Sequence, residues 1–360
     1  MTTANQVTFR FGVELELLLG SRAKKHKTWA SLAAELSTRL AKASIANHIN
    51  AGNEKTAENY REWSLVQEVT VPREVDKGLW GMELVSPILS PSPAEHWAGQ
   101  LRTIFAVLKK HFVVTASPHT STHVHVSTEP ALPAVALAAV AKAALYFEPA
   151  LDALLPASRG SGGGDGGGTY WCQSNRASVA MRGVGGGLTE CFALLDRCAG
   201  IVGGAAGGVG YGVGDGYAGG EIGGVEPLIR AMCLFPASSA YGRAHGYASD
   251  FVHGVYKWDF SGLLPDTGSG TLEYRQPPGS RTADEARAWI EVGLCFIAGA
   301  VDAGHALDPL AQADATMEDL WWVLCAGAQS TGLGELKGIE GMDFARGKTR
   351  ARGGRRWEVA

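Results

Sequence analysis

Residues Phe11 to Leu17 read FGVELEL and place two glutamates one residue apart in an apolar run. Successive side chains of a β-strand point to opposite faces, so Glu14 and Glu16 share one face while Val13 and Leu15 point to the other. Two carboxylates this close repel each other unless a cation or a proton intervenes. The stretch therefore predicts a strand with an apolar face and an acidic face, although such a pair also occurs on solvated outer faces.

The composition excludes several classes of protein. The chain has 360 residues and a formal net charge of only -4, which argues against a nucleic-acid partner or an anionic membrane. Its six cysteines are scattered without a CxxC pair, so we expect reduced thiols and no zinc site. Neither a signal peptide nor an apolar run of membrane-spanning length is recognised, and we expect a cytoplasmic protein.

The length allows one large domain or two modest ones, and we favour one. We expect a single catalytic domain over residues 1–345, with a glycine-rich insertion at about 160–224 and a basic tail over 346–360. Glycine loses the most backbone entropy on folding, so the glycine runs predict loops around an ordered island, TYWCQSNRASVAM. Two interpretations of the insertion stay open, a tolerated insertion and a lid that excludes water.

The spacing of hydrophobic residues predicts the secondary structure. Helical spacing predicts helices over 28–45, 93–112, 132–155, 282–303 and 316–328. Strands are predicted over 7–19, 63–71, 80–85, 123–127, 251–260 and 271–277. Ser92 is the expected N-cap of the second helix, and Trp321 and Trp322 are expected in the core. The irregular order of strands and helices favours an α+β fold with a mixed or antiparallel sheet.

Four further polar motifs lie on or beside predicted strands. They are GMELVSP with Glu83, THVHVS with His123 and His125, CQSNRAS with Asn175 and Arg176, and TLEYRQPPGS with Glu273 and Arg275. Each has a structural alternative: imidazoles can be satisfied core groups, and an acid and a base two residues apart can be a surface ion pair. Together they indicate a shared polar centre whose oxygen-rich ligands suit Mg²⁺ or Mn²⁺ better than zinc.

In that order, FGVELE, GMELVSP, STHVHVS and TLEYRQPPGS resemble the motifs of the amidoligase family, which is related to glutamine synthetase and γ-glutamylcysteine synthetase. The resemblance extends over about residues 9–303, with the glycine-rich insertion unmatched. It implies a glutamine-synthetase-like carboxylate-amine ligase fold, with a curved, mostly antiparallel sheet flanked by helices. The concave face of that sheet would hold ATP and divalent metal ions.

The resemblance also implies roles for the acids. Glu14 and Glu16 match the first-strand acids of the family and would contribute to two different metal sites. Glu83 would bind the metal on the substrate side. Glu273 would complete the metal site on the nucleotide side.

Histidines and cations complete the implied site. His123 would bind the nucleotide-side metal, and His125 would face the substrate or phosphate. Arg275 would hold the γ-phosphate or the substrate carboxylate. Further cations that could contact ATP or substrate are Arg176, Arg243, Lys257 and Arg281.

The segment WSLVQEVT, residues 63–70, is similar to a family segment that usually carries Asp and Ser, where this chain has Glu68 and Thr70. Asp259 stands in KWDF, where the family tends to carry Asn. These departures put the identity of the substrate in doubt. Candidates for the group that accepts the proton of the attacking amine are Glu68, Asp259 and Asp165.

The expected function is an ATP-dependent ligase that activates a carboxylate as an acyl phosphate and joins it to an amine. Its partners would be small-molecule or peptide acids and amines, and its cofactors ATP and Mg²⁺ or Mn²⁺. Two alternatives stay open: a phosphotransferase of a related fold, and a non-catalytic binding protein on the same scaffold.

Overall fold

The structure is a computed structural model that describes residues 7–160, 170–185, 187–201, 224–266, 268–313 and 315–339. Asp165, most of the glycine-rich runs and the basic tail lie outside these residues. Within them, one continuous hydrophobic core joins the N-terminal strands to the C-terminal helices.

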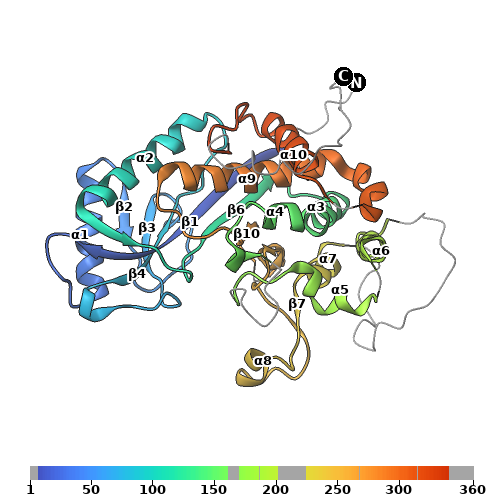
Figure 1. Ribbon diagram of the computed structural model, residues 1–360, viewed down its shortest axis with the longest axis horizontal. Helices are drawn as coiled ribbons and strands as arrows, with labels where there is room; N and C mark the ends of the chain where they lie inside the picture. Colours follow the sequence, from blue (N-terminus) through green and yellow to red (C-terminus); the bar gives the residue numbers. More distant parts are fainter. Residues whose placement is uncertain are drawn as a thin grey trace.

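The first strand, β1 (Thr8–Ser21), organises one large sheet (Figure 1). The strand order is β2 (Asn47–Ile49), β3 (Trp63–Gln67), β4 (Trp80–Val85), β1, β6 (Thr122–Glu129), β10 (Leu272–Tyr274) and β9 (Trp258–Asp259), and β5 (Phe112–Thr115) pairs with the end of β1. Every pair is antiparallel except β2 with β3. The prediction of a mostly antiparallel sheet with flanking helices is therefore confirmed.

One face of this sheet is covered by helices. They are α1 (Trp29–Lys42), α2 (Ala94–His111) and α9 (Ala283–Ala303), with α10 (Met317–Ser330) packed on α9. The side chains of Val13, Leu15 and Leu17 on β1 point into this layer and are almost fully buried. The apolar face predicted from alternation is thus the core face of the sheet.

A second group of helices follows β6. It consists of α3 (Ala134–Tyr146), α4 (Glu148–Asp152), α5 (Val179–Gly183), α6 (Leu188–Cys198) and α7 (Val225–Cys233). A short hairpin of β7 (Leu234–Phe235) and β8 (Phe251–Val252) carries α8 (Ala240–Ala244), which protrudes from the body in Figure 1. Short 3-10 turns complete the chain at Val75–Lys77, Ala157–Arg159, Asn175–Ala177, Ser261–Leu263 and Gly304–Gln312.

Several predicted boundaries are wrong. The helix expected over 132–155 is interrupted at Phe147 into α3 and α4, and the strand expected over 251–260 is two short strands. Pro93 is the N-cap of α2, and Ser92 makes no capping hydrogen bond. The helices α6 and α7 were not predicted.

Trp321 and Trp322 were expected in the core and are instead 37% and 45% exposed. Helix α10 packs on α9 through one face only, which carries Leu320, Val323 and Leu324. At about 100° per residue, Leu320, Val323 and Leu324 fall within one arc of the helix, and Trp321 and Trp322 lie outside that arc, toward solvent.

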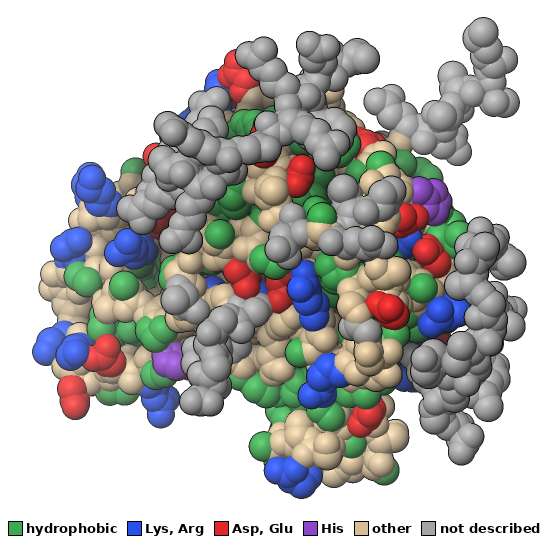
Figure 2. Space-filling view, turned by 45° about the vertical axis from the view of Figure 1, so that its right-hand side comes forward, with side chains coloured by type: hydrophobic (Ala, Val, Ile, Leu, Met, Phe, Trp, Pro, Cys, Tyr) green, Lys and Arg blue, Asp and Glu red, His purple; other side chains and the backbone are tan. Residues whose placement is uncertain are grey.

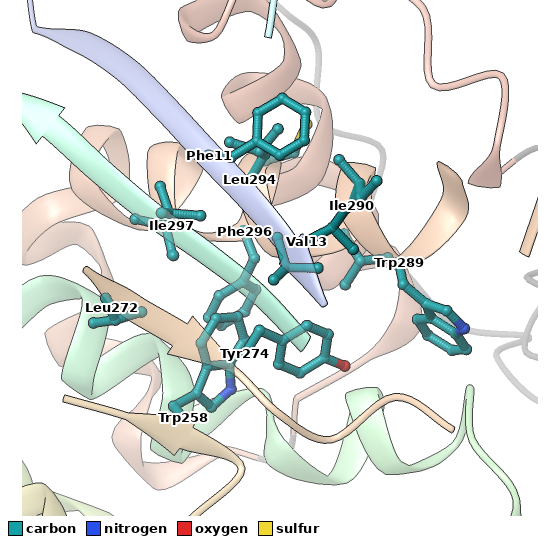
Figure 3. Packing of buried hydrophobic residues seen from close by; sticks show 14 of the residues in the cluster. Phe11, Val13, Trp258, Leu272, Tyr274, Trp289, Ile290, Leu294, Phe296 and Ile297 are labelled. Carbon is teal, nitrogen blue, oxygen red and sulfur yellow. The ribbon is translucent and has the colours of Figure 1, made fainter. Parts of the chain in front are cut away.

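Helix α9 is the central element of the core. Figure 3 shows its Leu294 beside Phe11 and its Ile290 near Val13 of β1, while Ile297 lies farther along, toward Leu272 of β10. The span Ala283–Asp308 is long and apolar enough to cross a membrane, contrary to the sequence-based expectation, but 72% of the window is buried within the protein. Burial on all sides explains its composition, because a fully buried helix has no need of a polar face.

Close contact between α9 and α10 depends on glycine. A Cβ atom at Gly327 would lie 1.8 Å from the carbonyl oxygen of Cys295, and one at Gly299 would lie 2.0 Å from that of Val323. Real Cβ atoms do not approach backbone this closely, so any side chain here would push the two helices apart.

Replacing Gly327 by alanine should therefore lower the free energy of unfolding by about 1–3 kcal/mol, as overpacking commonly does. Urea denaturation followed by circular dichroism measures the change. Gly183→Ala is the matched control, because a Cβ at Gly183 would meet nothing within 4 Å. Equal losses in the two variants would contradict the packing argument.

Candidate functional site

The face of the sheet opposite the helices carries the predicted polar side chains. Register explains their convergence, because directly paired residues point to the same face. Glu16 pairs with Glu83, and Glu14 pairs with His123. His125 pairs with Glu273, which in turn pairs with Asp259. Five strands therefore bring these groups together, and Figure 2 shows acidic and basic side chains next to each other near the middle of the molecule.

Three overlapping groups of side chains have the spacing of metal ligands. In each group one ligand atom per residue lies within 4.8 Å of the others. The groups are Glu14, Glu83 and His123; Glu14, His125 and Glu273; and Glu16, Glu68 and Glu83. All five residues predicted as metal ligands belong to them, and Glu14 and Glu83 each belong to two.

The two histidines lie between the carboxylates. His123 places Nδ1 3.1 Å from Glu14 Oε2 and 3.3 Å from Glu273 Oε1. His125 places Nε2 3.2 Å from Glu14 Oε1 and 3.6 Å from Glu273 Oε1. Each imidazole therefore bridges acids from two different strands.

Around Glu14, His125 and Glu273, the charges of the side chains balance one another. Burial acts to lower the pKa of His125, but the carboxylates of Glu273 and Glu14 raise it to about 9. Burial acts to raise the pKa of Glu14 and Glu273, yet both are lowered, Glu14 by His125 and His123 and Glu273 chiefly by Arg275. In the absence of a metal ion, the imidazolium of His125 supplies positive charge between the two acids.

The group formed by Glu16, Glu68 and Glu83 has surplus negative charge. The pKa of Glu83 is raised well above its ordinary value, first by burial and then by repulsion from Glu14, Glu16 and Glu68. Burial also raises the pKa of Glu16. Carboxylates crowded in this way are stabilised by a proton or by a cation. The donor set of oxygen atoms with two imidazoles therefore fits a hard divalent cation such as Mg²⁺ or Mn²⁺.

Arg275 borders the cluster. Its Nη1 donates to Glu273 Oε1 at 2.6 Å, and its Nε lies 3.5 Å from the carbonyl oxygen of Trp171. Burial opposes its charge, but Glu273 and Asp259 hold its pKa above the ordinary value. The guanidinium is 16% exposed, so it is fixed by the acids and still reaches the surface.

Two other predicted cations, Arg176 and Lys257, contact protein groups outside the three ligand groups. Arg176 donates from Nε to the carbonyl oxygen of Leu145 at 2.9 Å, at the end of α3. Lys257 is 2% exposed and pairs with Asp152 and Glu148. The structure therefore does not support the predicted roles of Arg176 in catalysis and of Lys257 in ATP binding, because both cations satisfy buried protein groups.

Arg243 lies on the protruding α8, where its guanidinium is exposed and donates to the carbonyl oxygen of Ser238. It is not part of the ligand groups described above, so its predicted contact with ATP also lacks support. Asn175, which precedes Arg176 in the sequence motif, is fully buried. Its side chain hydrogen-bonds the backbone of Trp258 and so holds β9 in place.

Some residues have a different place from the predicted one. Glu68 was a candidate proton acceptor and lies among the possible metal ligands with Glu16 and Glu83. His125 was expected to face the substrate or phosphate, and it also belongs to a ligand group with Glu14 and Glu273. Asp259 is buried, and its Oδ1 accepts a hydrogen bond from Ser261 N at 2.7 Å.

Tyr60 was not among the predicted site residues. Its pKa is raised by burial and by the charges of Glu14 and Glu83, with Lys55 acting in the opposite sense, so its phenol lies near the acids. Tyr60 precedes β3 in an irregular loop, and its neighbours in the sequence form no pattern that could have indicated this position.

The charge on His125 predicts how the metal-free protein responds to pH. Above pH 6.5 an unfolded histidine loses its proton, while folded His125 keeps its proton up to about pH 9. The folded state then binds more protons, so its stability should fall as pH rises through this range, by at most about 3 kcal/mol. Urea denaturation with a chelator at pH 6, 7, 8 and 9 measures the slope.

In that experiment His125→Gln should flatten the slope, and His96→Gln is the control because His96 is exposed on α2, away from the cluster. Equal slopes for the wild-type protein and His125→Gln would show that the imidazole is not held protonated by its acids.

Comparison with known proteins supports the relationship predicted from the motifs. Residues 7–162 match a family model described as "Putative amidoligase enzyme", which confirms the amidoligase resemblance over the segment that carries Glu14, Glu16, Glu83, His123 and His125. No curated protein matches the chain. Among solved structures, a bifunctional glutathione synthetase from Pasteurella multocida is 12% identical, with a TM-score of 0.36 and coverage of 96% of this chain and 51% of that one. The chain thus spans about half the length of that enzyme.

Proposed function

We propose that the protein is an ATP-dependent carboxylate-amine ligase that forms an amide bond through an acyl phosphate, on a glutamine-synthetase-like scaffold. The observation that carries the proposal is the convergence of Glu14, Glu16, Glu83, His123 and Glu273 on one sheet face. Four of these five lie in the segment that matches the amidoligase family.

The chemistry explains the need for such a site. A carboxylate does not condense with an amine in neutral water, so its oxygen first attacks the γ-phosphorus of ATP and ADP leaves. The amine nitrogen then attacks the acyl carbon, phosphate leaves, and the nitrogen loses a proton. Divalent metal ions held by the three ligand groups would neutralise the phosphate oxygens during transfer.

The residues of the chain have separate tasks in this scheme. Arg275 is positioned by Glu273 to hold a phosphate or carboxylate oxygen with its remaining donors. Asp259 has a pKa raised by burial and by Glu273, which makes it a better proton acceptor for the amine than an ordinary aspartate. Glu68 stays a second candidate for that step.

Nucleotide turnover tests the proposal. The protein should release ADP and phosphate from ATP and Mg²⁺ only when a carboxylic acid and an amine are both present. Turnover with a single acceptor and a stable phosphorylated product would instead identify a phosphotransferase. Binding of nucleotide without turnover under any combination would identify a binding protein on the same scaffold.

A further inference from the structure

The carboxylate of Glu16 is held by the loop that leads into β6. Ser121 N donates to Glu16 Oε2 at 2.7 Å, and Glu16 N donates to the carbonyl oxygen of Ser121 at 3.0 Å. Both bonds are made by the residue that directly precedes β6. The orientation of Glu16 toward Glu68 and Glu83, with which it forms a ligand group, therefore depends on the position of this loop.

Arg159 holds one side of the loop. It ends the short 3-10 turn that follows α4, and it is 2% exposed. Its Nη1 donates to Ser121 Oγ at 2.9 Å. Its Nη2 donates to the carbonyl oxygen of Pro118 at 3.2 Å and to that of Thr120. One guanidinium therefore binds three acceptors of a single loop, which its planar arrangement of donors allows.

The segment that follows β10 holds the other side of the loop. Thr122 N donates to the carbonyl oxygen of Pro277 at 3.2 Å. Gly279 N donates to the carbonyl oxygen of Thr120 at 2.8 Å. The contact is close, because a Cβ at Gly279 would lie 2.4 Å from Thr120 Oγ1. The loop is therefore fixed from both sides.

Gln276 links Arg159 to this segment. The side chain of Gln276 is fully buried, and its Nε2 donates to the carbonyl oxygen of Arg159 at 3.1 Å and to Asp152 Oδ1. Gln276 directly follows Arg275, which borders the ligand groups. The backbone of Arg159 is thus tied to the same stretch of chain that carries Glu273 and Arg275.

Stability alone does not explain an arginine at this position. The three acceptors that Arg159 binds in the loop are one hydroxyl and two carbonyl groups, all of them neutral. Burying a charge among neutral groups costs free energy that hydrogen bonds only partly offset. A requirement for a fixed loop beside Glu16 accounts for the charge and for the number of donors.

We propose that Arg159 is a positioning residue for a divalent cation bound by Glu16, Glu68 and Glu83. It acts through Ser121, whose N–H orients the Glu16 carboxylate, and it does not itself touch the cation. Buried partners that orient metal ligands typically contribute a factor of 10 to 100 in metal affinity. The inference rests on the proposed function only in requiring that a divalent cation binds to this group.

The test measures binding of Mn²⁺ to the full chain, with electron paramagnetic resonance of the free ion giving the number of sites and the Kd of each. Arg159→Met, which keeps an apolar side chain without donors, should raise the Kd of one site by about 10- to 100-fold. Glu68→Gln should weaken the same site, because Glu68 belongs to one ligand group only. Sites that do not contain Glu16 should keep their affinity.

Two further variants separate positioning from general stability. Arg159→Lys keeps the charge and part of the donor set, so it should recover part of the lost affinity. Arg287→Met is the matched control, because Arg287 is a buried arginine of α9 that pairs with Glu291 under the helices. This control should bind Mn²⁺ with the wild-type affinity at every site, even where its free energy of unfolding falls.

The outcomes distinguish this inference from the proposed function. Absence of Mn²⁺ binding to the wild-type protein would overturn both. If the wild-type protein binds Mn²⁺ and Arg159→Met binds it equally well, the positioning role alone is wrong. An equal loss at every site, or a similar loss in Arg287→Met, would show a general effect on the fold and would also overturn the role. If circular dichroism shows that Arg159→Met is unfolded, the same comparison is made with Arg159→Lys, whose affinity must then lie below the wild-type value at the one site.

Discussion

Replacing Glu14 by glutamine should abolish metal-dependent nucleotide turnover, with a loss of about 1,000-fold or more. Glu14 belongs to two of the three ligand groups, so one substitution weakens both. Loss of a metal worth several kcal/mol to the transition state corresponds to a factor of this size. Coupled measurement of ADP release at saturating Mg²⁺ tests the prediction.

The fold of the Glu14 variant should survive. Glutamine has nearly the same shape and can still accept the hydrogen bond from His123, while the apolar neighbours Val13 and Leu15 are untouched. Glu58→Gln is the matched control, because Glu58 is an acid with a side chain 72% exposed in a surface loop. Wild-type turnover in Glu14→Gln would rule out the assigned metal ligands.

The second large effect is expected for Arg275→Lys, which should lower kcat by about 100-fold because loss of one preorganised donor at a developing charge has that magnitude. Lysine keeps the charge but lacks the planar donor fork that can bind Glu273 and a phosphate together. Steady-state kinetics should show the loss in kcat, and calorimetry should show that Mg²⁺ still binds.

Arg243→Lys is the control for this substitution, since the guanidinium of Arg243 is exposed on α8 and contacts Ser238. We expect its kcat to match the wild-type value. A loss in Arg243→Lys as large as that in Arg275→Lys would place the nucleotide near α8 and contradict the site described here.

The local part of the site could be read from the sequence. Alternation along β1 separated Glu14 and Glu16 from Val13 and Leu15, and the same rule applied to His123, His125 and Glu273 on their strands. Short-range periodicity decides which face a side chain takes, and each of these strands keeps a regular pattern.

The predictions that the structure does not support concern partners distant in the sequence. Arg176 was a candidate contact for ATP or substrate and bonds the carbonyl oxygen of Leu145, and Lys257 bonds Asp152. No local pattern tells a cation that satisfies a buried carbonyl group or acid from one that awaits a phosphate.

The paired faces of β1 also constrain how this chain reaches its native state. A shift of β1 by one position against β4 and β6 would bury Glu14 and Glu16 under the helices and turn three apolar side chains toward water. Burying two unpaired carboxylates costs far more than a misaligned strand can recover. Glu14 and Glu16 therefore also disfavour a misaligned β1. Mutations that neutralise both acids should increase misfolding as well as remove activity.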